Sequence, residues 1–390
     1  MDKAQETKKQ HPIRRAVAFL ATVALILTAV FLVANWEKLN FDFIRRYFAY
    51  RSLARNENGQ VESFAYDGGS NSSFARMGND LIVCTRSGVK LYSESGAVYV
   101  DQTCSLTNPI LSSVGDIALV YDAGGTSLFV YQNRELAFTL PSESGRSILS
   151  ASLSAQGLLT VVTQTPGAKG EVTVYDSSFQ PTFGIKLSSR FITDAILSPD
   201  GRTLALATSG ETGGTYDSQI AFYALPRTDS ESKPDAVCSL GNNAILKLSW
   251  VNNSLRVLGE NALVFVNSDG TQAGSYSYNW RYLKGFSLDG DHFCTLLLGK
   301  YRAASAADLV TVDLSGNETA SLSMEEQVLS LSSSGRYLSV LTVDLLTIYS
   351  DDLNVYHITE DLQGARKVLQ RNDGSVTLIA PDAARLYLPD

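Results

Sequence analysis

The chain has 390 residues and a formal net charge of −8 at pH 7, from 32 Lys and Arg against 40 Asp and Glu. The charge divides unevenly: residues 1–60 hold ten basic and five acidic side chains, whereas residues 61–390 hold 22 basic and 35 acidic ones. Nucleic-acid binding needs a basic face on the folded part of a protein, so this distribution argues against nucleic acid as the main partner.

The first predicted element is a transmembrane helix at residues 16–34. These nineteen residues carry no charge and are rich in Leu, Val, Ala and Phe. At 1.5 Å per residue they make about 28 Å of helix, enough to cross the hydrocarbon core of a bilayer. Arg14 and Arg15 precede the run and Trp36 follows it, as at a membrane interface. Because the run is long and offers a poor cleavage site, we expect an uncleaved anchor and not a signal peptide.

Two segments flank this predicted span. Residues 1–15 form a short basic tail, but basic side chains also follow the span, so the positive-inside count is nearly balanced. A short tail ahead of a first apolar segment usually stays in the cytoplasm, which places the C-terminal part outside. Residues 35–60 carry a loose helical stripe of apolar side chains among Arg and Asp, so we expect an amphipathic juxtamembrane helix or a helical stalk.

From residue 61 onward the sequence is typical of an all-β domain. Short runs rich in Val, Leu, Ile, Tyr, Phe and Thr alternate with clusters of Gly, Asn, Asp and Ser, and no long helical period appears. The cysteines at 84, 104, 238 and 294 lack a C-x2-C spacing, which argues against a zinc site and a disulfide framework. Each lies in an apolar run and is expected to be a small buried side chain.

Two sequence markers repeat in step along residues 61–390. The first is a turn followed by an apolar strand, and its best-formed copy is Leu197–Ala207, "LSPDGRTLALA". Its eight turn positions are Gly78, Gly115, Gly157, Gly201, Asn253, Gly290, Gly335 and Gly374. The second marker is a strand that ends in an aromatic or β-branched residue, at Tyr92, Tyr131, Tyr175, Tyr223, Val266, Val312, Tyr349 and Tyr387.

A repeat of about 42 residues with four short strands is the signature of a β-propeller blade. We therefore predict an eight-bladed β-propeller at residues 61–390, or a seven-bladed one if an irregular repeat is not a blade. The last repeat ends at Asp390 after its third strand, while residues 60–67, "QVESFAYD", form a strand with no blade of its own. We expect this strand to join the last blade and close the ring, which removes the free edges.

No catalytic, metal or cofactor site is predicted. The three histidines, His11, His292 and His357, lack ligand-like spacing, and neither a G-x-S-x-G elbow nor a P-loop occurs. The segment "GETGGT" (210–215) precedes a strand and not a helix, so it predicts a hairpin loop and not a phosphate site. The acidic pairs at 325–326 and 351–352 fall in apparent loops, where solvated charge is the expected role.

One face of the predicted propeller is the candidate binding surface. The loops at 163–171, 208–218 and 299–308 join second to third strands, and they emerge on the same face as the connections between blades. Loops on a rigid scaffold are where binding residues tend to lie. The candidate binding residues are Arg146, Lys169, Arg190, Tyr216, Arg281, Lys300, Tyr301, Arg302 and Arg366. Alternatively, the arginines pair with neighbouring carboxylates.

The element "SPDGRTLAL" resembles the repeats of WD40-like and TolB-like propellers. The whole layout of basic tail, single span, juxtamembrane "NWEKLNFDFIRRYF" and degenerate blades resembles the bacterial domain-of-unknown-function family 5711. That resemblance implies a membrane-anchored propeller and brings no assigned activity or functional residues. The Gly-His and Trp-Asp marks of true WD40 blades and the blade-docking motifs of quinone-dependent dehydrogenases are missing.

We therefore expect a non-enzymatic, membrane-anchored propeller that binds a protein or a cell-envelope polymer outside the cytoplasm. The alternative is a hydrolase or lyase whose active site is assembled from several blades in the central funnel, because such groups leave no local motif.

Overall fold

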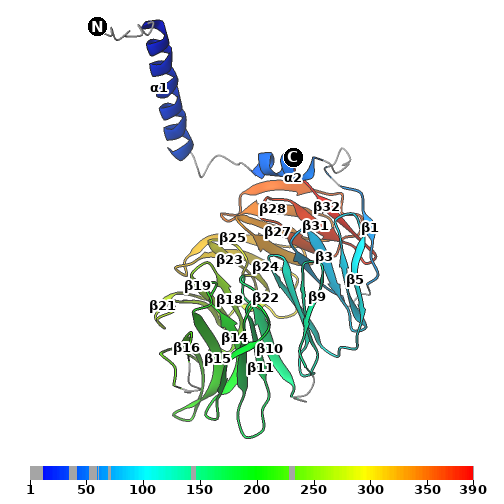
Figure 1. Cartoon of the computed structure of the whole chain (residues 1–390), viewed down its shortest axis with the longest axis vertical. Helices are drawn as coiled ribbons and strands as arrows, with labels where there is room; N and C mark the ends of the chain where they lie inside the picture. The colour runs from blue at the N-terminus through cyan, green and yellow to red at the C-terminus, as the bar shows by residue number, and fades with distance from the viewer. Residues whose placement is uncertain are drawn as a thin grey trace, which may run out of the picture. The chain divides into compact units, whose positions relative to one another are not determined.

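The computed structural model of the chain is shown in Figure 1. It describes residues 12–34, 42–51, 59, 61–68, 72–141, 146–227 and 233–389. The chain divides into two compact units, Met1–Ser52 and Leu53–Asp390. The boundaries predicted within residues 1–60 fall partly outside the described residues and stay predictions.

The first unit contains two helices, α1 (Pro12–Ala34) and α2 (Asp42–Tyr50), among its described residues. α2 lies within the predicted juxtamembrane segment, and Asp42 in its first turn complements the positive end of the helix dipole. None of the described helices has the length and apolar character that a membrane span requires. The span predicted at residues 16–34 therefore rests on the sequence alone.

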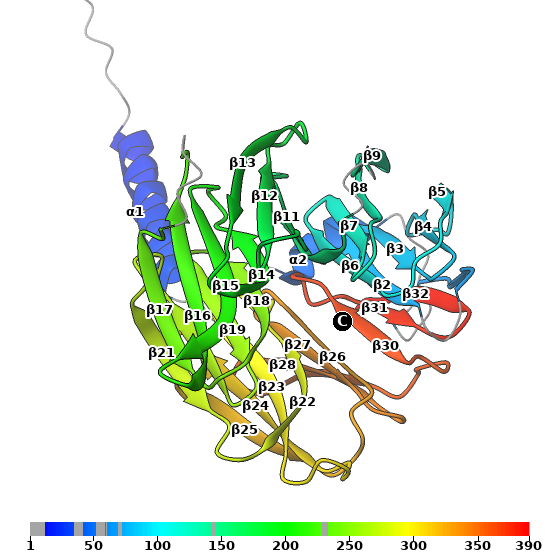
Figure 2. The same cartoon turned by 90° about the horizontal axis from the view of Figure 1, so that it is seen from below.

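The described residues of the second unit form eight four-stranded antiparallel sheets, which confirms the predicted eight-bladed all-β propeller. Figure 2 shows the blades following one another around the ring in chain order. Blades 1 to 4 consist of β2 (Ser73–Met77), β3 (Asp80–Cys84), β4 (Gly88–Tyr92) and β5 (Val98–Thr103); β6 (Pro109–Val114), β7 (Ile117–Asp122), β8 (Leu128–Gln132) and β9 (Glu135–Thr139); β10 (Ile148–Leu153), β11 (Leu159–Thr163), β12 (Glu171–Tyr175) and β13 (Pro181–Lys186); β14 (Phe191–Leu197), β15 (Thr203–Thr212), β16 (Thr215–Ala224) and β17 (Ala236–Gly241).

Blades 5 to 8 consist of β18 (Ile245–Val251), β19 (Ser254–Gly259), β20 (Ala262–Val266) and β21 (Gln272–Ser277); β22 (Tyr282–Ser287), β23 (Phe293–Gly299), β24 (Ala307–Asp313) and β25 (Glu318–Met324); β26 (Ser330–Ser334), β27 (Tyr337–Leu341), β28 (Leu346–Ser350) and β29 (Val355–Thr359); β30 (Lys367–Gln370), β31 (Val376–Ile379), β32 (Ala383–Tyr387) and β1 (Phe64–Ala65).

The ring closes as predicted, because β1 is the outer strand of the last blade. Phe64 lies opposite Ala384 and Ala65 opposite Ala383 in an antiparallel pair. The Val61 amide extends the pairing by donating to the Leu386 carbonyl at 2.9 Å. The first strand of the domain is thus joined to its last one, and β32 has no free edge.

The hydrophobic core lies between adjacent blades. The second strands β3, β7, β23, β27 and β31 are buried at every position, whereas outer strands such as β5 and β9 are largely exposed. One buried cluster joins blades 3 and 4, another joins blades 4 and 5, and a third joins blades 5 and 6. Because each blade is buried on both faces, its middle strands are continuous apolar runs and do not alternate.

The repeated turn is confirmed in six blades and differs in two. Six of the predicted turn glycines have positive φ, at Gly78, Gly115, Gly157, Gly201, Gly335 and Gly374. In blade 5 the left-handed residue is Asn252 (φ 53°), the first of the two turn residues, and not the predicted Asn253. Asparagine is the side chain that tolerates this conformation best after glycine. In blade 6 Gly290 instead forms a parallel bridge with Gly335.

The four strands of each blade run up and down, which sorts the connections onto two faces. The front face is defined here as the end of the ring that carries the connections between second and third strands and those between successive blades. The back face carries the remaining turns. The predicted binding residues are near the front face because they lie in or beside its connections.

Candidate functional site

The strands nearest the centre of the ring are not alike. The first strands of adjacent blades lie next to one another, as β2 does beside β6, β10 beside β14 and β26 beside β30. In four consecutive blades the register of this strand shifts near its start, between Ile148 and Ser150, Ile192 and Asp194, Ile245 and Lys247, and Leu283 and Gly285. The first strands of blades 1, 2, 7 and 8 pair without a shift. Bulges re-aim side chains and often lie next to functional sites.

Exposed aromatic side chains gather at the front face of the bulged blades. Phe191 and Tyr282 begin the first strands of blades 4 and 6, and both are exposed. The full set, called the front-face aromatics below, is Phe191, Tyr216, Trp280, Tyr282 and Tyr301. Two exposed aliphatic side chains, Leu149 and Leu246, are the extra residues of the bulges in blades 3 and 5. Trp and Tyr are the residues most enriched among binding hot spots.

Three of the predicted binding arginines are tied to carboxylates of their own blades. Each precedes a first strand and pairs with an acidic residue near the start of the third strand of the same blade. Arg146 pairs with Glu171, Arg190 with Asp217 at 3.3 Å, and Arg281 with Asp308 at 3.2 Å. The alternative of structural pairing therefore holds for these three residues.

The Arg190–Asp217 pair is embedded in further hydrogen bonds within blade 4. Burial raises the pKa of Asp217, but hydrogen bonds from Ser239, Thr212 and Gln219 and the charge of Arg190 outweigh it, so the pKa lies below its usual value. Gln219 Nε2 donates to Asp217 Oδ2 at 2.6 Å, and Arg190 Nε donates to Thr208 Oγ1 at 3.1 Å. The pair is therefore a hydrogen-bonded ion pair within blade 4.

The other predicted residues have different surroundings. Lys169 Nζ donates to the Ser189 carbonyl at 2.9 Å and lies 4.9 Å from the Phe191 ring centre. The Tyr216 hydroxyl accepts a hydrogen bond from Ser218 at 2.9 Å. Arg366 is exposed just before β30 of blade 8, away from the bulged blades.

The predicted loop at 208–218 is instead a long hairpin. β15 and β16 pair as far as Thr212 and Thr215, and Gly213 and Gly214 form the turn with φ of 62° and 81°. Two positive φ values define a type I′ turn, which glycine adopts without strain. Tyr216 lies opposite Glu211 near the tip, so this hairpin carries one of the front-face aromatics.

Five exposed or charged residues lie at the front end of blade 6. Tyr282 lies opposite Gly299 in the ladder of β22 and β23, so Lys300 follows directly after its partner. Trp280 precedes Tyr282 by two positions. The blade-6 patch, as it is called below, consists of Trp280, Tyr282, Lys300, Tyr301 and Arg302. The last three were predicted from the sequence, whereas Trp280 and Tyr282 were missed.

The cations of the blade-6 patch differ from the tied arginines. Lys300 Nζ lies 5.5 Å from the Tyr301 ring centre. Within the part of the chain that the structure describes, no carboxylate forms an ion pair with Lys300 or Arg302. Two positive charges thus lie beside exposed aromatic rings with no internal counter-ion, which is a composition suited to recognition.

Asp194 is the one acidic side chain in the described first strands. The Ala195 amide donates to its Oδ1 at 2.9 Å. Burial raises its pKa, and the nearby Ser150 side chain, the Leu248 amide and the charge of Lys247 oppose that rise. Ser150 lies on β10 of blade 3, and Lys247 and Leu248 lie on β18 of blade 5, so Asp194 is buried between the innermost strands of the two neighbouring blades. The alternative of a funnel hydrolase or lyase needs several converging groups, and the described first strands contribute this single carboxylate. Among the described residues, no group of three or more His, Cys, Asp or Glu could hold a metal ion.

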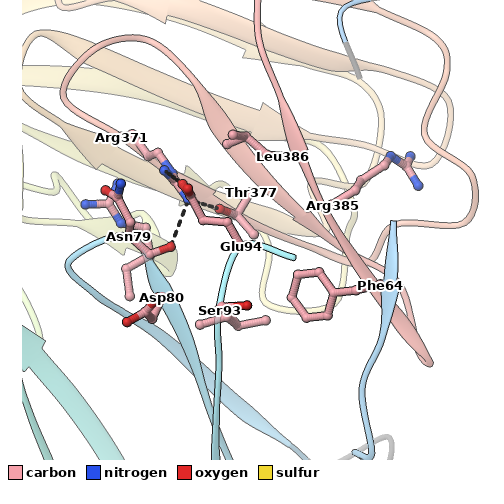
Figure 3. Close-up of a pocket in the computed structure, with 11 residues that line it drawn as sticks. Phe64, Asn79, Asp80, Ser93, Glu94, Arg371, Thr377, Arg385 and Leu386 are labelled. Atoms are coloured by element: carbon pink, nitrogen blue, oxygen red, sulfur yellow. Dashed lines mark hydrogen bonds and ion pairs between the residues drawn. The ribbon is translucent and has the colours of Figure 1, made fainter. Parts of the chain in front are cut away.

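A pocket on the back face marks the ring closure. Figure 3 shows Arg371 and Glu94 directed toward each other, while the guanidinium of Arg385 is directed away from them. Arg371 of blade 8 pairs with Glu94 of blade 1 at 2.9 Å, and it donates to the Asn79 carbonyl at 3.3 Å. Asp80 in the same pocket accepts two hydrogen bonds from Arg134 of blade 2, at 2.7 and 3.2 Å. These contacts bind three blades together, so the pocket is a structural junction.

Solved structures confirm the fold and nothing finer. The chain is similar to the C-terminal WD40 domain of Sif2, at 12% identity and a TM-score of 0.59, over 85% of this chain and 99% of that one. BamB from Moraxella catarrhalis is 14% identical to this chain, with a TM-score of 0.52, over 84% of this chain and 97% of that one. The quinohemoprotein alcohol dehydrogenase ADHIIG from Pseudomonas putida HK5 is 9% identical, with a TM-score of 0.53, over 85% of this chain and 76% of that one. No curated protein matches the chain in sequence.

Eight antiparallel four-stranded blades closed by an N-terminal strand define a β-propeller of the WD40-like and TolB-like class. Within that class, the sequence pattern of one family matches residues 50–358. The chain belongs to this family of unknown function, DUF5711, as its layout predicted.

Proposed function

We propose that this protein is a binding scaffold whose propeller presents the front face of blades 3–6 to a protein partner. The observation that carries the proposal is the gathering of Phe191, Tyr216, Trp280, Tyr282 and Tyr301 on this face of an otherwise acidic domain. Aromatic side chains contribute much of the binding energy at protein interfaces, and Trp and Tyr are the most enriched of them.

We also propose that the propeller is held at the cell membrane and faces away from the cytoplasm. The support is the uncharged run at residues 16–34, which lies within α1, together with the short basic tail before it. A tethered scaffold is confined to the membrane, which raises its local concentration toward a partner that is held there as well.

Site-specific photocrosslinking tests the binding face. A photoreactive phenylalanine analogue replaces Tyr301 on the front face or, as a matched control, Val237, which is exposed on the outer strand β17. The crosslinked protein is identified and purified, and its affinity is measured with the full-length chain. We expect one protein to crosslink at position 301 and not at 237, and Tyr282→Ala to weaken its binding at least tenfold while Val237→Ala leaves it unchanged.

Two outcomes contradict the proposal. Equal crosslinking at the two positions means that the front face is not the binding surface. Capture of a polysaccharide in place of a protein means that the aromatic side chains stack on sugar rings of an envelope polymer, and the protein-binding proposal is then wrong.

Cysteine labelling in intact cells tests the orientation. Arg202 is exposed on the back face of blade 4, so Arg202→Cys provides a reactive thiol in the propeller, and Lys3→Cys provides one in the tail. A membrane-impermeant maleimide is expected to label position 202 and not position 3 until the cells are lysed. The reverse pattern places the propeller in the cytoplasm.

A further inference from the structure

Trp280 occupies a backbone conformation that normally belongs to glycine. The Arg281 amide donates to the Tyr278 carbonyl at 3.0 Å and closes a turn with Asn279 and Trp280 at its centre. Their φ values are 52° and 65°, as in a type I′ turn. The second central position of such a turn favours glycine strongly, because a side chain there crowds its own carbonyl. Trp280 is nevertheless 100% exposed.

A second turn in the molecule provides a matched comparison. Asn133 and Arg134 connect β8 to β9 with φ of 54° and 66°, which is nearly the same backbone. There the strained residue has a structural role. Arg134 binds both oxygens of Asp80 in the neighbouring blade, and its guanidinium carbon lies 4.3 Å from the Tyr99 ring centre. The contacts of Arg134 offset the strain of its backbone.

No such contact offsets the strain at Trp280. Across the described ranges, no residue forms a hydrogen bond or ring contact with its side chain. A large aromatic residue in a left-handed conformation and in full contact with water lowers the stability of the fold, and no contact within the described residues compensates for it. Strained residues of this kind are typical of ligand-binding sites.

The surroundings of Trp280 define the chemistry of a ligand. Tyr282 and Tyr301 extend the aromatic surface, and Lys300 and Arg302 add positive charge without a carboxylate partner among the described residues. The nearby Arg281 is neutralised by Asp308, so it does not contribute. Unpaired acidic side chains also lie in front-face connections, at Glu211 and Glu260 of blades 4 and 5 and at Glu325 and Glu326 directly after β25 of blade 6, but none lies in the blade-6 loop 300–306 itself.

We infer that the blade-6 patch is a docking site for an acidic polypeptide segment and that Trp280 is its anchor. An apolar side chain of the segment packs against Trp280 and Tyr282, while its carboxylates bind Lys300 and the guanidinium of Arg302. The inference rests on the proposed function and names the partner chemistry for that same face. Segments with few carboxylates gain only the apolar contact, so charge decides which partner binds.

Fluorescence anisotropy with defined peptides tests this site on the full-length chain in lipid nanodiscs. The probe is a labelled twelve-residue peptide of alternating glutamate and leucine, and its counterparts carry glutamine or lysine in place of glutamate. We expect the acidic peptide to bind at least tenfold more tightly than the glutamine peptide and the lysine peptide not to bind. Added salt is expected to weaken the binding of the acidic peptide and not that of the glutamine peptide.

Variants assign the binding to the patch. Trp280→Ala and the charge reversal Arg302→Glu are each expected to lower the affinity for the acidic peptide at least tenfold. Arg202→Glu reverses an exposed charge on the back face and is the matched control, expected to leave binding unchanged. The Trp280 emission provides a second readout, taken as the difference between the wild type and Trp280→Phe. It is expected to shift to shorter wavelength when the acidic peptide binds.

Two results overturn the inference. Equal binding of the acidic and glutamine peptides means that charge does not select the partner. Unchanged binding in Trp280→Ala means that this residue is not the anchor. If the protein crosslinked at position 301 still depends on Tyr282 but not on Arg302, the docking chemistry is wrong and the scaffold function stands. If it depends on neither, the proposed function fails as well.

Discussion

Blades 3–6 and the other four blades have the same four strands but differ in the strand nearest the axis. In blades 3–6 this strand carries a bulge close to the front face, and exposed residues such as Leu149 and Leu246 are the inserted ones. In blades 1, 2, 7 and 8 the strand pairs in plain register. The regular half contains the ring closure, while the bulged half exposes side chains that are not part of the buried core.

The two halves also use buried arginines differently. In the regular half Arg371 joins blade 8 to blade 1 through the carboxylate of Glu94. In the bulged half Arg256 is fully buried and joins blade 5 to blade 6 through backbone carbonyls, donating to Gly290 at 2.6 Å, Asp291 at 2.9 Å and Phe293 at 3.2 Å. These bonds hold the turn of blade 6 in its exceptional shape.

The largest predicted effect concerns these two arginines. Arg256→Met leaves several buried carbonyls without donors and is expected to lower the free energy of unfolding by about 3 kcal/mol. Arg371→Met frees a carboxylate that is near solvent, so its cost is expected to be smaller, about 1–2 kcal/mol. Urea denaturation of the two variants measures the difference. A larger loss in Arg371→Met contradicts the role given to Arg256.

Glycine at position 280 is expected to separate stability from binding. Trp280→Gly relieves the left-handed strain and is expected to stabilise the fold by up to about 1 kcal/mol, while binding of the acidic peptide is lost. Arg134→Gly in the regular half relieves the same strain but breaks the contact with Asp80, so it is expected to destabilise the fold. Thermal unfolding of both variants checks the opposite signs. Loss of stability in Trp280→Gly means that the tryptophan is needed for the fold.

One aspartate in each half is expected to make stability respond to pH in opposite directions. Burial raises the pKa of Asp194 in the bulged half above its ordinary value of 3.8, so the stability it contributes is present below that pH and is lost as pH rises through the raised pKa. A hydrogen bond from Ser350 and others hold the pKa of Asp352 in blade 7 below 3.8, so its contribution is present at neutral pH and is lost as pH falls.

Asparagine variants measure these contributions. Relative to the wild type, Asp194→Asn is expected to gain melting temperature from about pH 4 to pH 7, because it removes a carboxylate that must ionise while buried. Asp352→Asn is expected to match the wild type at acid pH and to fall slightly below it at neutral pH, by less than about 0.5 kcal/mol for an exposed turn. Parallel pH profiles for Asp194→Asn and the wild type contradict the assignment.

The smallest predicted effect compares two exposed aliphatic residues at equivalent places. Leu246 is the bulge residue of blade 5, and Ile110 lies near the start of the unbulged first strand of blade 2. Replacing either by serine is expected to change stability by less than about 0.5 kcal/mol. Only Leu246→Ser is expected to lower the affinity for the partner that crosslinks at position 301, by a factor of a few. Equal effects in the two variants mean that the bulged half is not distinct in binding.

The sequence by itself determined the scaffold, because turn glycines and strand ends recur with the period of a blade. Eight blades and closure by residues 60–67 follow from that period and from the missing strand of the last repeat. It also located Lys300, Tyr301 and Arg302 in a front-face loop. The repeat is visible because every blade meets the same requirement, a buried middle strand between two tight turns.

Only the tertiary structure decided which of those residues are available to a partner. Arg146, Arg190 and Arg281 are bound to carboxylates about 25 residues away, and nothing in the local sequence separates them from Arg302. The bulges depend on the register of two strands, and a shift of one residue moves a side chain to the other face. Trp280 was missed because its exposure and positive φ belong to a turn between two blades. Whether a charged side chain is already paired within the fold depends on which residues lie beside it in space, and the order of residues along the chain does not show this.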